Sequence, residues 1–168
     1  MLFRSRRFVE ERGVEPEEKY VEGFKRVALG LAPTFIVPAP DAKRTLDELE
    51  RRGIPRGVLS NGWNPLQVLK ARRAGFNGRV IASADLGVQK PNPRAFAALT
   101  EALGVPAERC YYIGDDPAAD VVGAMSAGLQ AVWLDNEGKT YPPGLPKAPR
   151  IVSYLNEFLS ILPAVVTS

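Results

Sequence analysis

Three polar segments of the chain carry side chains that could do chemistry. In the first, Ser60 is followed by Asn61 and Gly62, so a hydroxyl and two peptide N–H groups could bind an anionic oxygen such as that of a phosphate. A strand that ends in Ser-Asn-Gly usually leads only into a turn, and that interpretation holds if Ser60 has no partners. In the second segment Lys90 precedes Pro91, which by itself is typical of a solvated surface charge.

The third segment, GDDPAAD, contains the carboxylates Asp115, Asp116 and Asp120. They fall at the end of a predicted strand and over the first turn of the next helix. Asp116 could cap a helix that begins at Pro117, but one cap explains only one carboxylate. Three crowded carboxylates repel one another, and a cation with hard oxygen ligands, with Mg²⁺ as the first candidate, relieves that repulsion. The segment therefore predicts a metal site.

Composition excludes several other chemistries. The 168 residues contain no histidine and one cysteine, Cys110, so His-based nucleophile activation, histidine-ligated zinc and an intrachain disulfide are excluded. The net charge of +3 comes from scattered arginines, which does not indicate a nucleic-acid partner. No apolar run is long enough to span a bilayer. A cytoplasmic protein that acts on a small molecule is the expectation.

Hydrophobic spacing and Gly or Pro punctuation predict the elements that position these segments. The predicted helices cover residues 16–31, 42–53, 64–75, 92–104, 117–127 and about 155–162. The predicted strands cover residues 57–59, 79–82, 110–113 and 130–134. Strands that alternate with helices in this way favour a doubly wound, parallel α/β sheet, with ligands beyond the carboxyl ends of its strands. The first helix is predicted to be an added cap.

In this order, Ser60, Lys90 and the GDDPAAD segment resemble motifs two, three and four of the haloacid dehalogenase-like hydrolase superfamily. The resemblance covers about residues 33–162. It implies that residues 33–168 form a Rossmann-like α/β core and that residues 1–32 are the remnant of a helical cap. The branch with such a cap includes many phosphatases of small molecules.

The resemblance also implies an activity and roles for the three segments. The implied reaction is hydrolysis of a small phosphorylated metabolite through an aspartyl-phosphate intermediate, with Mg²⁺ as cofactor. The acidic cluster favours a phosphatase over a metal-free dehalogenase. The residues implied to bind phosphate are Ser60, Asn61, Gly62 and Lys90, of which Ser60 and Lys90 would also be catalytic. The implied metal site consists of Asp115 with Asp116 or Asp120 as a further ligand or an orienting group.

Motif one of that superfamily, an apolar strand followed by Asp-x-Asp, has no counterpart before Ser60. Asp41 and Asp47 fall in a helical pattern. We therefore expect the central nucleophile strand to be missing, the sequence to be truncated at its N-terminus, and the chain to be inactive by itself. The inner strand edges should then leave a gap or close upon each other. The alternative is a non-catalytic binding or regulatory protein that kept a phosphate and metal pocket.

Overall fold

The computed structural model describes residues 18–163, so the part of the predicted cap remnant before Glu18 lies outside the described residues. The α-helices are α2 (Glu18–Phe35), α3 (Ala42–Arg51), α4 (Leu66–Arg73), α5 (Ser83–Leu86), α6 (Pro93–Leu103), α7 (Gly123–Ser126) and α8 (Phe158–Ile161). The other helical turns are η1 (Ala107–Arg109), η2 (Pro117–Val122) and η3 (Leu155–Glu157). The strands are β1 (Gly57–Ser60), β2 (Arg79–Ala82), β3 (Tyr111–Gly114), β4 (Gln130–Leu134) and β5 (Ile151–Val152).

The four predicted strands are confirmed as β1 to β4, with bounds that differ by no more than a residue at each end. Two short elements were not predicted. Helix α5 occupies a polar stretch directly after β2, and β5 has two residues within a Pro-rich segment, so neither is long enough to show a hydrophobic period. The predicted α/β alternation with parallel strands is confirmed.

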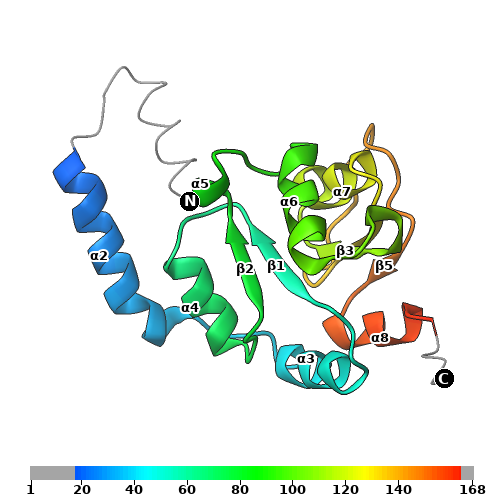
Figure 1. The fold of residues 1–168 in the computed structure, drawn as a ribbon, viewed down its shortest axis with the longest axis horizontal. Helices are drawn as coiled ribbons and strands as arrows, with labels where there is room; N and C mark the ends of the chain where they lie inside the picture. The colour runs from blue at the N-terminus through cyan, green and yellow to red at the C-terminus, as the bar shows by residue number, and fades with distance from the viewer. Residues whose placement is uncertain (1–17, 164–168) are drawn as a thin grey trace.

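The predicted single sheet is divided into two (Figure 1). One sheet consists of β1 and β2, which are parallel, with Leu59 opposite Ile81. The other has the order β3, β4, β5, also parallel, with Ile113 opposite Val132. Within residues 18–163 no strand pairs with the inner edge of β1 or of β3. A gap, which was one of the two expected outcomes, therefore separates the sheets.

An apolar cavity of about 660 Å³ occupies this gap. Val58 and Leu59 of β1 and the facing residues Tyr112 and Ile113 of β3 all line it. Side chains of α3, α4 and α6 also contribute, among them Leu49, so the cavity has helices around it as well as two strand edges. We call this cavity the central slot.

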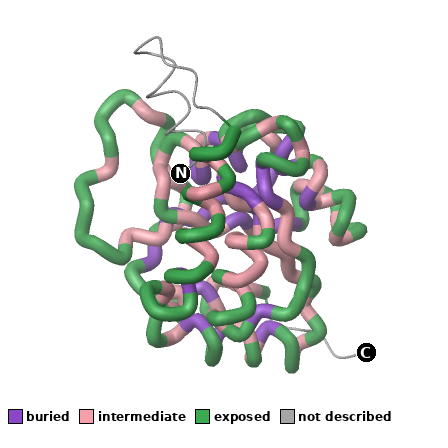
Figure 2. Tube along the Cα trace, turned by 90° about the vertical axis from the view of Figure 1, so that its left-hand side faces the viewer, coloured by how far each residue is buried: buried purple, intermediate pink, exposed green. Residues whose placement is uncertain are grey.

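Alternate residues of each strand point to opposite faces, so the three-stranded sheet has buried side chains on both faces. Helices cover each of these faces. Tyr112, Ala131 and Trp133 join one core cluster with Phe96 of α6. Val132 lies in a second cluster on the other face, which contains side chains of α3, β5 and α8. The buried segments accordingly run through the interior of the trace, with exposed loops outside (Figure 2).

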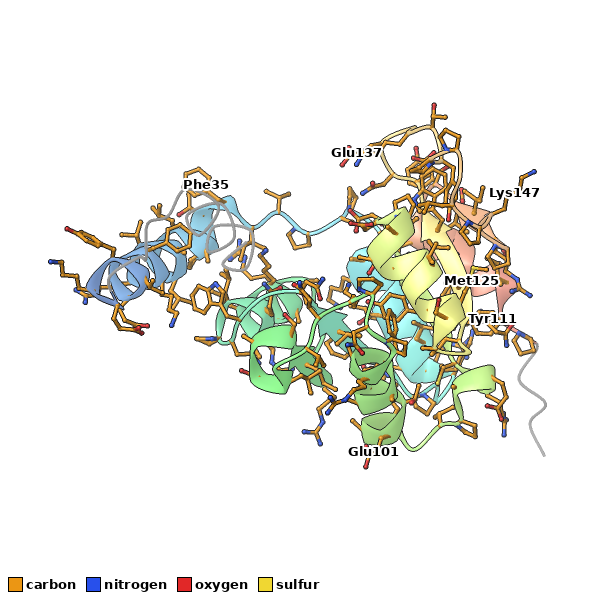
Figure 3. The ribbon with its side chains drawn as sticks, turned by 90° about the horizontal axis from the view of Figure 1, so that it is seen from above. Phe35, Glu101, Tyr111, Met125, Glu137 and Lys147 are labelled. Atoms are coloured by element: carbon orange, nitrogen blue, oxygen red, sulfur yellow. The ribbon has the colours of Figure 1, made fainter. Side chains whose placement is uncertain are left out.

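Helix α2 carries the predicted apolar stripe, but most of that stripe is exposed. Tyr20, Phe24, Val27 and Leu31 are each 44–63% exposed, and the helix stands beside the rest of the chain (Figure 3). It ends at Phe35, so it crosses the predicted boundary between a cap remnant and a core at residue 32. Among the described residues no helix combines the length and the apolar composition that crossing a membrane would require.

Replacement of Gly123 by alanine should destabilise the fold, because a Cβ at this position would lie 2.9 Å from the Phe96 ring and 3.0 Å from the Cα of Pro91. Such overpacking costs about 1–3 kcal/mol in the free energy of unfolding. Gly30→Ala is the matched control, since its methyl group would meet nothing within 4 Å and helix propensity alone should raise stability by about 0.5–1 kcal/mol. Urea denaturation followed by circular dichroism measures both effects. Equal stability of Gly123→Ala and wild type would contradict this packing.

Candidate active site

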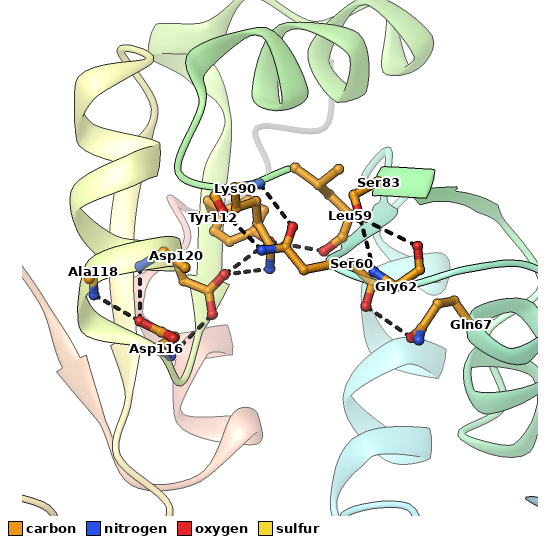
Figure 4. Close-up of polar contacts among 12 residues, drawn as sticks. Leu59, Ser60, Gly62, Gln67, Ser83, Lys90, Tyr112, Asp116, Ala118 and Asp120 are labelled. Carbon is orange, nitrogen blue, oxygen red and sulfur yellow. Dashed lines mark hydrogen bonds and ion pairs between the residues drawn. The ribbon is translucent and has the colours of Figure 1, made fainter. Parts of the chain in front are cut away.

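The three polar segments meet beside the carboxyl ends of β1 and β3 (Figure 4). Ser60 is the last residue of β1, and Asp115 follows β3 directly. Lys90 comes from the loop between α5 and α6. This is the place at which parallel α/β sheets bind ligands, because the loops after neighbouring strands converge there.

The segment Ser60 to Gly62 is held by side chains on both of its sides. Ser60 Oγ donates a hydrogen bond to Gln67 Oε1 at 2.9 Å, so Ser60 does have a partner. The Gly62 N–H donates to Ser83 Oγ at 3.0 Å, and Ser83 Oγ donates to the Gly62 carbonyl at 3.3 Å. Ser83 is fully buried, so these bonds satisfy its hydroxyl group and tie the loop to the residue that follows β2.

Asn61 connects this loop to the loop that contains Lys90. Its Nδ2 donates to the Lys90 carbonyl at 2.9 Å, and its Oδ1 accepts from the Lys90 N–H at 2.8 Å. The two bonds are reciprocal, so they fix both the separation and the orientation of the two loops. In this structure Asn61 therefore acts on the position of the Lys90 backbone.

The Lys90 side chain is not a solvated surface charge; it is only 11% exposed. Its Nζ lies 2.5 Å from Asp120 Oδ1 and donates to Tyr112 Oη at 3.0 Å. The Asp120 side chain is 5% exposed, and its other oxygen accepts from the Asp116 N–H at 3.1 Å. Both charges of this buried ion pair thus have hydrogen-bond partners besides each other, which burial of such a pair requires.

Tyr112 lies against this pair. Burial raises the pKa of its phenol, and the negative charge of Asp120 raises it further, so the hydroxyl keeps its proton. That hydroxyl donates to the Leu59 carbonyl at 3.1 Å. The ring packs edge-to-face on Phe96, with 5.0 Å between the centroids. Tyr112 therefore links β3, β1 and the loop of Lys90.

The three carboxylates of the GDDPAAD segment have three different surroundings. Asp116 Oδ1 accepts from the N–H groups of Ala118 and Ala119, both at 2.9 Å, as the N-cap of η2, which agrees with the helix-cap interpretation. Asp120 is paired with Lys90. The metal site predicted at Asp115, Asp116 and Asp120 stays a prediction; within residues 18–163 no three metal-ligating side chains form one group.

Asp115 is the carboxylate that fits a magnesium ion. It is exposed, and among the described residues no group donates a hydrogen bond to its carboxylate. Its main-chain carbonyl accepts from Trp133 Nε1 at 3.2 Å, which anchors the backbone that carries it. One or two carboxylates with waters and a substrate phosphate are a common set of Mg²⁺ ligands in proteins. The residues present therefore fit the ion through Asp115, whereas Asp116 and Asp120 have other partners.

Steric crowding explains why residue 114, directly before Asp115, is a glycine. A Cβ on Gly114 would overlap the carboxyl group of Asp120, which approaches the end of β3 from η2. Glycine thus lets the buried pair sit directly over the strand. Any larger residue would push Asp120, and with it Lys90, out of place.

Three positioning residues were not among the predicted site residues. Ser83 directly follows the strand predicted over 79–82, and a polar residue at a carboxyl strand end was a usable signal. Tyr112 lies inside a predicted strand, where an aromatic residue indicates core packing. Gln67 has no sequence signal, because its contact with Ser60 depends on how α4 leaves the loop.

Comparison with known proteins gives the class to which this fold and site belong. The chain belongs to the haloacid dehalogenase-like hydrolase family, which its sequence matches over residues 3–128. It is 40% identical over 99 residues to a phosphoserine phosphatase of Thermus thermophilus, an alignment that covers 57% of this chain and 40% of that protein. It is 33% identical over 125 residues to a glyceraldehyde 3-phosphate phosphatase of Methanopyrus kandleri, covering 73% and 54% respectively.

Two further similarities bear on the fold and on the range of activities. An (S)-2-haloacid dehalogenase of Burkholderia cepacia is 34% identical over 135 residues, which is 76% of this chain and 56% of that protein. The structure of a phosphatase of the family from Thermococcus onnurineus superposes with a TM-score of 0.73 at 24% identity, covering 92% of this chain and 68% of the other. The chain spans about half the length of the curated relatives it matches.

Asp116→Ala should lower the free energy of unfolding by about 0.5–2 kcal/mol, because it removes the side chain that accepts two N–H groups at the start of η2. Asp116→Asn should keep most of that stability, since asparagine caps nearly as well as aspartate. Asp115→Ala, an exposed neighbour, should stay within about 0.5 kcal/mol of wild type. Thermal and urea denaturation of the three variants checks the assignment. Loss of stability in Asp116→Asn equal to that in Asp116→Ala would contradict it.

Proposed function

We propose that this chain carries the phosphate- and metal-binding half of a phosphatase active site that acts on small phosphorylated metabolites. The observation that carries the proposal is the buried Lys90–Asp120 pair beside Ser60, at the carboxyl ends of β1 and β3. An ammonium group held in one place, next to a hydroxyl, suits a phosphoryl group that bears negative charge on several oxygens. The phosphatases among the relatives support the same class of reaction.

In this proposal the donors of β1 and of the Lys90 loop bind the transferring phosphoryl group. Ser60 turns its hydroxyl from Gln67 to a phosphate oxygen, and the Asn61 and Gly62 segment supplies peptide N–H groups nearby. Lys90 keeps one ammonium proton on Asp120 and directs another to the phosphoryl group. Such preorganised donors lower the barrier because they need not reorient as charge shifts.

The proposed cofactor is Mg²⁺, with Asp115 as its protein ligand. When bound, the ion supplies charge neutralisation that allows two negatively charged groups to approach each other. Asp116 and Asp120 act on its site indirectly. Asp116 orders the first turn of η2, and Asp120 neutralises the ammonium group of Lys90.

The nucleophile is the part of the proposal that residues 18–163 do not supply. The sequence contains no Asp-x-Asp pair. We propose that a further parallel strand occupies the central slot and carries it, because the unpaired edges of β1 and β3 both line one apolar cavity. The carboxyl end of such a strand would lie between Ser60 and Asp115. Its first aspartate would attack phosphorus, and its second would protonate the leaving ester oxygen before water releases inorganic phosphate.

A non-catalytic phosphate-binding protein is the second candidate, because no nucleophile is arranged among the described residues. The two candidates differ in what happens when a strand is supplied. A binding protein would take up inorganic phosphate without turnover under every condition. A phosphatase site would turn over once the strand and Mg²⁺ are both present.

The test supplies that strand. The chain alone should release no phosphate from p-nitrophenyl phosphate, since no carboxylate nucleophile is placed beside Ser60. Addition of the segment of a full-length relative that contains an apolar strand and Asp-x-Asp, as a fusion or a separate peptide, should produce Mg²⁺-dependent release. The same segment with its first aspartate changed to asparagine is the matched control and should give none.

Asp115→Asn in the complemented protein should lower Mg²⁺-dependent turnover by roughly 100-fold or more, because it removes the charged metal ligand while leaving the exposed site folded. Turnover by the chain alone, or turnover unaffected by Asp115→Asn, would overturn the proposal. Substrate profiling over sugar phosphates and phosphorylated acids would then define the substrate class.

A further inference from the structure

The ammonium group of Lys90 has two acceptors within residues 18–163, and they are not equivalent. Asp120 supplies the opposite charge, at 2.5 Å, and its carboxylate belongs to η2. Tyr112 Oη accepts at 3.0 Å and is neutral. A carboxylate alone permits the ammonium group to pivot about it, whereas a second acceptor in another direction defines its position.

The phenol of Tyr112 has one proton, and the distances indicate where it points. The Leu59 carbonyl lies 3.1 Å away and Asp120 Oδ1 lies 3.4 Å away, so the carbonyl is the better acceptor. Tyr112 therefore accepts from Lys90 and donates to the peptide that joins Leu59 to Ser60. A carbonyl oxygen has two lone pairs, so this bond leaves room for a peptide N–H from a neighbouring strand.

We propose that Tyr112 is a positioning residue that ties the ammonium group of Lys90 to the backbone of Ser60. This inference rests on the proposed function for its purpose but not for its geometry. Asn61 sets where the Lys90 main chain lies, and Tyr112 sets where the tip of its side chain lies. The Ser60 hydroxyl and the Lys90 ammonium group are the two donors proposed to bind one phosphoryl group. Through Tyr112, the position of both depends on the same peptide, the one that joins Leu59 to Ser60.

The phenol is placed to do this because its ring is immobilised. Tyr112 is 8% exposed and packs edge-to-face on Phe96. Its neighbour Tyr111 lies on the opposite face of β3, where it packs edge-to-face on Phe158 and its hydroxyl has no hydrogen bond among the described residues. The chain thus offers a matched pair of tyrosines, one with the proposed role and one without.

The experiment compares wild type, Tyr112→Phe and Tyr111→Phe as full chains labelled with ¹⁵N- and ¹³C-lysine. In wild type the Lys90 ammonium should give a resolved ¹H–¹⁵N correlation with slow proton exchange, and its Hε protons should show a through-space contact to the Tyr112 ring. Tyr112→Phe should accelerate that exchange about tenfold, the effect expected for loss of one hydrogen bond, and Tyr111→Phe should leave it unchanged. Equal exchange in all three proteins would overturn the proposal.

Titration with inorganic phosphate separates this proposal from the proposed function. Wild type should show a phosphate-dependent shift of the Lys90 ammonium, and Tyr112→Phe, measured at a temperature where it is fully folded, should bind phosphate about threefold to tenfold more weakly. Phosphate binding is wrong if phosphate shifts no Lys90 signal in wild type. The positioning role stands in that case if Tyr112→Phe still accelerates exchange of the Lys90 ammonium protons. If Tyr112→Phe does not fold, the through-space contact in wild type decides, and its absence would refute the role of Tyr112.

Discussion

The candidate site depends on the buried ion pair between Lys90 and Asp120. Removal of an ammonium and a carboxylate from water costs several kcal/mol for each ion, and their attraction offsets this only when the remaining hydrogen-bonding capacity is satisfied. Here Tyr112 accepts from the ammonium, and the Asp116 N–H donates to the second carboxylate oxygen. The loop before α6, strand β3 and η2 must therefore keep their relative positions, since displacement of any one leaves a buried charge unpaired.

Helix α6 is what keeps the two halves of the divided sheet in register around that pair. Phe96 and Leu99 belong to the same core cluster as Leu59 of β1 and Tyr112 of β3, so one helix packs on both sheets. The carboxyl ends of β1 and β3 consequently stay side by side although no ladder of backbone hydrogen bonds joins them within residues 18–163. Between β1 and β3, the packing of α6 and the hydrogen bonds of the Tyr112 phenol hold the strands together. Elsewhere in the sheets, backbone pairing between strands has this role.

Much of the fold could be predicted from the sequence, because strands β1 to β4 are short apolar runs between glycines and prolines, and a hydrophobic period identifies such elements locally. The predicted strands also placed Ser60 and Asp115 just beyond strand ends, and they lie at the ends of β1 and β3. The division of the sheet depends on which distant segments pair, and a local hydrophobic pattern does not determine that pairing. The expectation of a gap came instead from the absence of an apolar strand followed by Asp-x-Asp. Ser83 and Tyr112 were missed because their roles come from contacts 21 and 22 residues away along the chain.

The carboxylates of GDDPAAD show how the fold itself supplies part of the compensation that neighbouring negative charges require. Three neighbouring negative charges do require compensation. From the sequence, a metal ion is the predicted compensation, because crowded carboxylates favour a cation with hard oxygen ligands. In the folded chain Lys90 neutralises Asp120, and two peptide N–H groups at the start of η2 solvate Asp116. Of the three carboxylates, that of Asp115 is the one that is exposed and accepts no hydrogen bond from the described residues. An external cation is therefore needed for one carboxylate and not for three. One carboxylate is enough for a magnesium ion that also binds a substrate phosphate, as in the proposed function.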